Sequence, residues 1–451
     1  MNNLRNIPKI DKITKDKIFK KFNTKLLTKI TKQKIQKLRE GLLNKSIEIV
    51  DEKSLLDDIK RAYEEIFQPS LKPLINATGV ILHTNMGRSL IDEELLERAK
   101  PLICNYSNLE YNLKEGSRGE RYEHVSSHLK NLLAVEDVLV VNNNASAVFL
   151  VLNTFAKGKE VIVSRGELVE IGGSFRIPEV MSQSGAILRE VGATNKTKLN
   201  DYAKTINENT KMLMKVHQSN FSIEGFSESV PYEKIKELSE ENNLLDYYDL
   251  GSGYIPILPY NLGQKEPSLI EILKSNPSLI SFSGDKLFGS VQAGIIAGKR
   301  ELIAKLKENQ LLRMLRVDKI TLSLLEETIK AYLKEEYERI PTLNMLFKDT
   351  EELKKRALHV EVQIGSNLLS ILETKTVMGG GTLPNREFPS IALHVKGKAQ
   401  KLEREFRKKL IIGRIENDKF LLDFRTIQPK DEELLIKTTK EIINETKQHS
   451  S

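Results

Sequence analysis

The chain of 451 residues is poor in cysteine and has no long apolar run. Because Cys104 is the single cysteine, neither an internal disulfide nor a cysteine-based metal cluster can form, and a reducing compartment is the natural setting. No stretch of about 18 apolar residues is present, so we expect no membrane span. The start, MNNLRNIPKIDKITKDK, lacks the apolar core of a secretory signal. These absences together predict a cytoplasmic protein.

The excess of positive over negative charge is confined to the start of the chain. Residues 1–50 contain fourteen Lys and Arg against four Asp and Glu, a net charge of +10, whereas the remaining residues carry a net charge of −2. Apolar residues recur there at three- and four-residue steps, which predicts a helical module that ends near Pro69. Such a field attracts polyanions such as nucleic acid. A solvated lysine-rich helix face is the alternative.

The rest of the chain alternates short apolar runs with helical patterns. Alternation of this kind requires crossover connections, so it predicts an α/β fold with a mainly parallel sheet. The predicted strands are 138–141, 160–164, 186–191, 211–217, 244–250, 278–283 and 293–298. We expect three domains: a basic helical domain over 1–70, a large domain over 71–338 and a small C-terminal α/β domain over 339–451. In the last, we predict a helix over 351–372, strands over 390–395 and 420–426, and a closing helix.

Lys286 stands in a turn just past the predicted strand 278–283, and the strand 293–298 follows almost at once. Ligands of open α/β sheets bind at such strand ends. A lysine held between two apolar strands is partly desolvated, which lowers its pKa and suits it to Schiff-base chemistry. An ordinary loop lysine is the alternative for this residue on its own.

Two further features fit the needs of pyridoxal phosphate. This cofactor needs a lysine, a carboxylate against its pyridinium nitrogen and a helix N-terminus for its phosphate. Asp249 ends an apolar run, and the strand 138–141 leads through Asn142 directly into a helix whose free N–H groups suit a phosphate. A well-capped helix is the alternative for that junction. The predicted cofactor-binding residues are Lys286, Asp249, Asn143, Asn144, Ala145, Ser146, His217 and Ser252, with Lys286 and Asp249 also catalytic.

Cationic and imidazole side chains precede the first large-domain strand. Arg118 and Arg121 flank a glycine in a loop suited to an anion, and INATGVILHTNMGR carries Arg88 among small and polar residues typical of a site wall. His124 and His128 are four apart on a predicted helix, but the glutamate of the zinc motif HExxH is absent. We therefore interpret these histidines as a packed helix face and expect no metal site.

Longer strings are more specific than any of these motifs. They are INATGVILHTNMGR, YSNLEYNLKEGSRGERY, VVNNNASAV, SRGELVEIGGSFRIPEVM, VGATNKT, KVHQSNFSIEGF, DLGSGY, SGDKLFGSVQAGIIAG, LRMLRVDKITL, GGGTLPNREFPS and GRIENDKFLLDFRT. Together they resemble the bacterial selenocysteine synthases, the L-seryl-tRNA(Sec) selenium transferases, over almost the whole chain. The resemblance implies a fold-type-I transferase that depends on pyridoxal phosphate.

The resemblance also implies a reaction and partners. Seryl-tRNA(Sec) would be converted to selenocysteinyl-tRNA(Sec) with selenophosphate: the serine amine displaces Lys286 from its Schiff base, the freed lysine takes the Cα proton, and selenium adds to an aminoacrylyl-tRNA. Arg88, Arg313 and Arg316 fall in family motifs and would bind the selenophosphate anion. The basic N-terminal domain would bind tRNA, largely by shape. The family further implies a homo-oligomer, dimer-based and forming a larger ring, with each site built from two subunits.

Three alternatives stay open. A lyase or aminotransferase that acts on a free amino acid would share every cofactor residue, and only the basic N-terminus argues against it. A desulfurase needs a nucleophilic cysteine on a mobile loop, for which Cys104 is poorly suited. A non-catalytic RNA-binding relative is disfavoured by the retained Asp249 and Lys286. We expect Arg425 to be structural, because an aminoacyl ester offers no free α-carboxylate.

Overall fold

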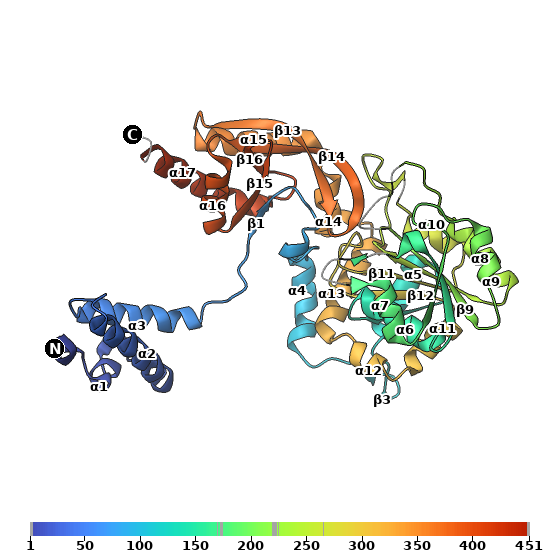
Figure 1. Cartoon of the computed structure of the whole chain (residues 1–451), viewed down its shortest axis with the longest axis horizontal. Coiled ribbons are helices and arrows are strands. Elements are labelled where there is room, and N and C mark those ends of the chain that lie inside the picture. The colour runs from blue at the N-terminus through green and yellow to red at the C-terminus, as the bar shows by residue number, and fades with distance from the viewer. Residues whose placement is uncertain are drawn as a thin grey trace. The chain divides into compact units, whose positions relative to one another are not determined.

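The computed structural model describes residues 3–168, 170–171, 175–218, 223, 225–264 and 266–448, and the chain separates into two compact units, Met1–Pro73 and Leu74–Ser451 (Figure 1). No helix within these described ranges is both long enough and apolar enough to cross a membrane.

The first unit is helical, as predicted. Its helices are α1 (Ile10–Thr14), α2 (Thr24–Leu43) and α3 (Glu52–Ile66), and a short 3-10 helix, Lys17–Phe19, lies between α1 and α2. They enclose a small apolar core, and the Phe22 and Tyr63 rings stack with centroids 4.1 Å apart. Asn23 caps α2 by accepting from the Leu26 N–H, and its own N–H donates to the Tyr63 hydroxyl over 2.7 Å. Because the core takes the apolar stripe, most lysines of this unit are exposed.

The main feature of the second unit is a seven-stranded sheet in the order β4-β12-β11-β10-β9-β5-β8. All neighbours pair in parallel except β12, which runs antiparallel to both β11 and β4, so the predicted mainly parallel sheet is confirmed. The strands are β4 (Asp137–Val141), β5 (Glu160–Ser164), β8 (Ile187–Val191), β9 (Thr210–Val216), β10 (Leu245–Gly251), β11 (Leu279–Ser283) and β12 (Gly294–Gly298). Each begins and ends within one residue of its predicted bounds. Continuous apolar runs mark the strands buried on both faces, such as β4, β5 and β11, whereas the edge strand β8 is largely exposed.

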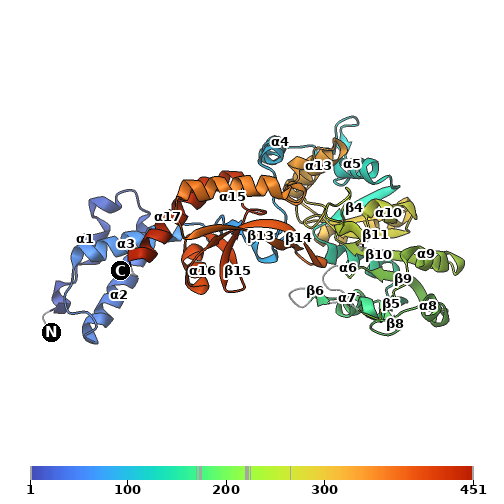
Figure 2. The same cartoon turned by 90° about the horizontal axis from the view of Figure 1, so that it is seen from above.

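Helices cover both faces of this sheet (Figure 2). Alternate residues of β4 face opposite ways: Val138 and Val140 pack with α5 (Glu123–Leu133) and α13 (Lys319–Leu333), whereas Leu139 and Val141 pack with α6 (Asn144–Phe155) and α7 (Ile177–Ser184). The other helices are α4 (Glu93–Cys104), α8 (Leu199–Thr205), α9 (Tyr232–Glu241), α10 (Leu269–Lys274), α11 (Arg300–Glu308) and α12 (Leu312–Leu315). The carboxyl ends of the parallel strands therefore stay open for a site.

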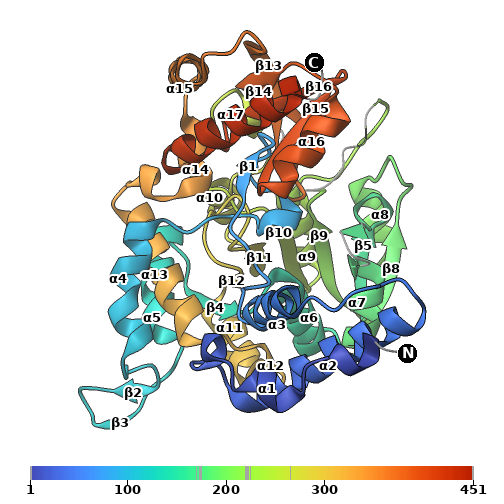
Figure 3. The ribbon, with the colours of Figure 1, turned by 90° about the vertical axis from the view of Figure 1, so that its left-hand side faces the viewer.

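The C-terminal part holds a second sheet of five strands, ordered β1-β15-β16-β14-β13. Its helices α15, α16 and α17 pack on one core with it and can be followed in Figure 3. The strands are β1 (Ile75–Ala77), β13 (Leu369–Gly379), β14 (Thr382–Val395), β15 (Ile411–Glu416) and β16 (Lys419–Asp423), and the helices are α14 (Pro341–Phe347), α15 (Thr350–Ile364), α16 (Ala399–Lys408) and α17 (Glu432–Gln448). Strand β1 pairs in parallel with β15, so a segment from the start of this unit completes a sheet built from its end.

The helix predicted over 351–372 was wrong in its second half. Helix α15 ends at Ile364 because Gly365 takes a left-handed conformation with φ 66° and caps it. Strand β13 then begins at Leu369 and pairs along its length with β14. The apolar residues of 369–372 therefore belong to the sheet. The prediction had assigned them to the helix because their spacing continues its apolar pattern.

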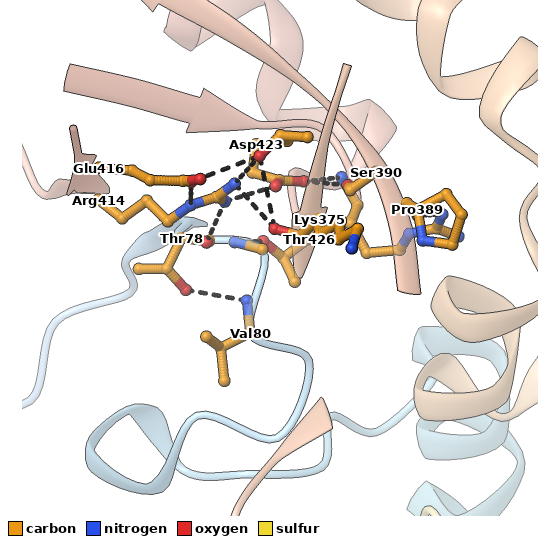
Figure 4. A network of polar contacts seen from close by, with 12 residues as sticks. Thr78, Val80, Lys375, Pro389, Ser390, Arg414, Glu416, Asp423 and Thr426 are labelled. Carbon is orange, nitrogen blue, oxygen red and sulfur yellow. Dashed lines mark hydrogen bonds and ion pairs between the residues drawn. The ribbon is translucent and has the colours of Figure 1, made fainter. Parts of the chain in front are cut away.

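A buried polar network fastens β1 and the turn after it to this sheet (Figure 4). Asp423 is fully buried and accepts from Ser390 Oγ over 2.5 Å and from an Arg414 guanidinium nitrogen. Arg414 also donates to the Thr78 carbonyl over 2.7 Å. Gly79 packs so closely here, with φ 86°, that an added Cβ would lie 2.6 Å from Asp423 Oδ2. Only glycine fits this position.

We therefore expect Gly79→Ala to lower the free energy of unfolding by about 3 kcal/mol, from left-handed strain and from contact with Asp423. Gly158→Ala is the matched control: its φ is 70°, yet nothing lies within 4 Å of the added methyl. It should cost only about 1 kcal/mol. Urea unfolding followed by circular dichroism measures both, and equal losses would contradict the role of the close packing.

Candidate functional site

Lys286 lies in a buried turn between β11 and β12. The turn is fixed by hydrogen bonds from the Gly284 N–H to the Ala293 carbonyl and from the Gly289 N–H to the Lys286 carbonyl, at 2.8 and 2.9 Å. The lysine is 6% exposed. Burial lowers its pKa, and the positive charge of Arg88 lowers it further, while the Asp249 carboxylate opposes the shift. The amine is thus easier to deprotonate than an ordinary surface lysine.

Asp249 lies near the end of β10, the strand that pairs in parallel with β11. It is 4% exposed, and burial raises its pKa, while a hydrogen bond from Asn144 and the charges of Lys286 and His217 oppose the shift. Asn144 Nδ2 donates to Asp249 Oδ1 over 2.8 Å. The carboxylate and the amine are close enough to influence each other's pKa. The sheet therefore brings together the two residues that the sequence predicted as catalytic.

The predicted phosphate-binding residues Asn143, Asn144, Ala145 and Ser146 lie at the N-terminus of α6. Asn143 is the cap, and its Oδ1 accepts from the Ser146 N–H over 2.8 Å. The start of the helix presses against β12, where a Cβ on Gly294 would meet the Asn143 carbonyl oxygen at 2.1 Å. Asn144 Oδ1 is buried with no hydrogen-bond partner among the described residues. This junction therefore offers an unpaired hydrogen-bond acceptor, Asn144 Oδ1, beside Asp249.

His217 and Ser252 meet through a residue that sequence reasoning missed. His217 Nε2 donates to Glu266 Oε2 over 2.8 Å, and Ser252 Oγ donates to the other oxygen of the same carboxylate. Glu266 is 4% exposed, and its carboxylate, like His217, borders a cavity of about 660 Å³. No motif marks Glu266, since it lies between a 3-10 turn and α10 rather than at a strand end.

Arg88 is the one predicted anion-binding arginine that the chain places beside Lys286. Its Nη1 donates to Asp285 Oδ2 over 2.9 Å, and Asp285 in turn accepts from Ser283 Oγ over 2.8 Å. Arg88 has a left-handed φ of 60°, and its N–H donates to the His83 carbonyl. A guanidinium is therefore fixed next to the residue that precedes Lys286.

The other four predicted arginines form a separate cationic cluster around Glu110. Arg121 binds Glu110 Oε1 through Nε and Nη2 at 3.0 and 2.8 Å, and Arg316 and Arg118 approach the carboxylate at 3.5 and 3.6 Å. Arg121 lowers the pKa of Glu110. With Arg313 they line a cavity of about 380 Å³. The backbone of Arg316 pairs with Val141, the last residue of β4, so the cluster lies beside the strand that leads into α6.

His124 and His128 bind backbone carbonyls. His124 Nε2 lies 3.2 Å from the Asn108 carbonyl oxygen, and His128 Nδ1 lies 3.0 Å from the His124 carbonyl oxygen. Over the part of the chain that the structure describes, no group of three or more histidine, cysteine or acidic side chains is arranged to hold a metal ion. Arg425 is likewise structural: it is buried and donates to the Met345, Lys348 and Pro389 carbonyls.

The mainly parallel sheet with a buried lysine and carboxylate at its strand ends defines an α/β enzyme of fold type I. The solved structure of D-glucosaminate-6-phosphate ammonia-lyase shares the fold, with a TM-score of 0.61 and 17% identity over 85% of this chain and 98% of that one. The sequence profile of the L-seryl-tRNA selenium transferase (SelA) family matches residues 74–428. The chain belongs to this family, as its strings predicted.

Two curated relatives match along nearly their full length. The L-seryl-tRNA(Sec) selenium transferase of Aliarcobacter butzleri is 56% identical over 99% of this chain and 100% of its own. The protein of the same name from Sulfurimonas denitrificans is 57% identical over 98% of this chain and 99% of its own. The N-terminal unit, which lies outside the family profile, is therefore included in the similarity to these relatives.

The charges around Lys286 give opposite predictions for two variants. Asp249 raises the pKa of Lys286, so Asp249→Asn should lower it; Arg88 lowers that pKa, so Arg88→Gln should raise it. The pH dependence of amine acylation at Lys286 in the cofactor-free protein, followed by peptide mass spectrometry, gives the midpoint. Midpoints that move in the same direction in both variants would contradict this electrostatic arrangement.

Proposed function

We propose that this chain converts L-seryl-tRNA(Sec) to L-selenocysteinyl-tRNA(Sec) with selenophosphate, using pyridoxal phosphate bound at Lys286. The observation that carries the proposal is the buried pair of Lys286 and Asp249 beside the N-terminus of α6, in a chain 56% identical to a protein named L-seryl-tRNA(Sec) selenium transferase. Membership of the family indicates the substrate, and the buried pair supports the chemistry of a Schiff-base cofactor.

The residues present fit pyridoxal phosphate. Lys286 is a buried amine with a lowered pKa, which favours Schiff-base formation. Asp249 offers a buried carboxylate to a pyridinium nitrogen. The Ser146 N–H donates to the Asn143 cap, and the N–H groups before it at the start of α6 have no partner within the helix and suit a phosphate. The unpaired Asn144 Oδ1 adds polar capacity there. We propose that Asn143, Asn144, Ala145, Ser146, His217 and Ser252 complete the cofactor site.

Bound pyridoxal phosphate supplies an electron sink for the charge that develops when the Cα proton of serine leaves. Lys286 is the base for this proton, because its lowered pKa leaves a larger neutral fraction to accept it. Asp249, oriented by the hydrogen bond from Asn144 Nδ2, would offer its carboxylate to the ring nitrogen of the cofactor. The surrounding turn from Gly284 to Ser290 is buried and keeps water from the lysine.

Two sets of arginines are candidates for selenophosphate. Arg88 is held next to Asp285 beside Lys286. Arg118, Arg121, Arg313 and Arg316 line one cavity beside Glu110. We propose that the chain forms a dimer-based, larger homo-oligomer, in which a second subunit brings this cluster to the lysine.

The N-terminal unit is proposed to bind the tRNA. Its net charge of +10 over residues 1–50 and its exposed lysines suit contact with a phosphate backbone. A functional division then follows, with a tRNA-binding domain near 1–70, a large cofactor domain near 71–338 and a small domain beyond. A cytoplasmic location agrees with a reaction on an aminoacyl group carried by tRNA.

Incubation with seryl-tRNA(Sec) and selenophosphate should yield selenocysteinyl-tRNA, whereas free serine should not react. Lys286→Ala should lower the rate by about a hundredfold or more, because it removes the base. Lys305→Ala, at an exposed position of α11, is the matched control and should keep the parent rate. Product measured by acid-gel or mass analysis decides the matter, and turnover of free serine alone would overturn the proposal.

Replacing Lys29 and Lys32 of α2 with Gln should weaken tRNA binding and reduce the slope of log affinity against log salt by about 1.5, since each lysine neutralises a phosphate. The matched control changes Lys401 and Lys437, both exposed on helices of the second unit. Filter binding over a range of salt concentrations gives both slopes. If the control pair lowers the slope as much, the N-terminal unit is not the principal tRNA contact.

A further inference from the structure

We propose that Glu266 is a positioning residue of the cofactor site, which fixes the ring of His217 by accepting a hydrogen bond from its Nε2–H. This inference rests on the proposed function, because it concerns pyridoxal phosphate at the same site. It adds a residue that lies outside every string by which the chain resembles its family.

The contacts of Glu266 account for both carboxylate oxygens. Oε2 accepts from His217 Nε2 over 2.8 Å, and Oε1 accepts from Ser252 Oγ. The backbone carbonyl of Glu266 accepts from the Tyr254 hydroxyl over 2.8 Å. Ser252 and Tyr254 both come from the segment that directly follows β10, so the strand that carries Asp249 also holds Glu266. A buried carboxylate with these partners has one well-defined orientation.

A closed set of hydrogen bonds joins the ends of β9 and β10. The His217 N–H donates to the Asp249 carbonyl over 2.9 Å, which ties the two strand ends through the backbone. The His217 side chain then returns through Glu266 to Ser252, three residues after Asp249. Both the backbone and the ring of His217 are thereby fixed relative to Asp249.

This closed set of hydrogen bonds depends on a tight turn after Ser252. Gly253 has φ 72°, and an added Cβ would lie 2.6 Å from the Phe282 ring. Phe282 belongs to β11, the strand that leads to Lys286. The turn that presents Ser252 to Glu266 is therefore packed against the strand that presents the lysine.

The Glu266 carboxylate fixes which nitrogen of a neutral His217 ring carries the proton. A carboxylate can only accept, so the proton of a neutral ring resides on Nε2 and Nδ1 is left as an acceptor; a protonated ring would donate from both nitrogens. Glutamine at position 266 could offer its amide N–H to Nε2 instead, which moves the proton to Nδ1. The identity of residue 266 thus decides what His217 presents to a ligand beside Asp249.

The affinity of the cofactor-free protein for pyridoxal phosphate, measured by absorbance titration, tests this role apart from catalysis. Glu266→Gln should raise the dissociation constant about tenfold. In a His217→Asn background the same change should have less than about a twofold effect, because the ring through which Glu266 acts is gone. Far-ultraviolet circular dichroism checks that each variant is folded.

Glu160→Gln is the matched control. Glu160 is also 4% exposed and has two side-chain partners, Arg189 and Asn207, but it begins β5 at the opposite end of the sheet. It should keep the parent affinity. If Glu266→Gln does not fold, Glu266→Asp serves instead: it keeps the charge but withdraws it by one methylene, and it should also weaken binding.

The outcomes separate the two proposals. A parent protein that binds no pyridoxal phosphate would overturn both. Normal binding by the parent with unchanged affinity in Glu266→Gln would overturn only the role of Glu266. An equal loss in Glu160→Gln, or a full tenfold loss that persists without His217, would also overturn it, because the effect would then not pass through the imidazole.

Discussion

The burial of two opposite charges, Lys286 and Asp249, is the constraint on which the rest of the site depends. Desolvation favours the neutral form of both, lowering the pKa of the amine and raising that of the carboxylate. Each charge opposes the shift of the other, so neither is stable there alone. The fold must therefore hold the two side chains together, and parallel pairing of β10 with β11 does so by bringing their carboxyl ends to one edge.

The helix and strands around this pair contact the Asp249 carboxylate or its backbone. The start of α6 can approach Asp249 because Gly294 leaves room for the Asn143 carbonyl, and Asn144 then reaches the carboxylate. On the other side, the end of β9 brings His217 against Asp249 through a backbone hydrogen bond. A central position in the sheet explains why three strands and one helix N-terminus converge on a single carboxylate.

The segment from β1 to Arg88 connects this site with the C-terminal sheet. It begins in the Asp423 and Arg414 network, where Gly79 is the only residue that fits. It continues through a hydrogen bond from the Leu82 N–H to the Met378 carbonyl, and it ends with Arg88 on Asp285. A short stretch of sequence thus links a remote buried ion pair to the charge beside Lys286, within one compact unit.

The sequence alone was sufficient for the buried strands of the large sheet, because these are continuous apolar runs that end at polar residues. It also located Lys286, Asp249 and the start of α6, since strand ends and helix caps are local features. Tertiary structure decided the rest. Glu266 reaches His217 and Ser252 only through folding, and β1 finds its partner β15 more than three hundred residues later. The arginines around Glu110 likewise come from distant parts of the chain, and only folding brings Arg121 and Arg316 to the same carboxylate. Contacts between distant segments are set by packing in three dimensions, for which no local pattern of residues carries a signal.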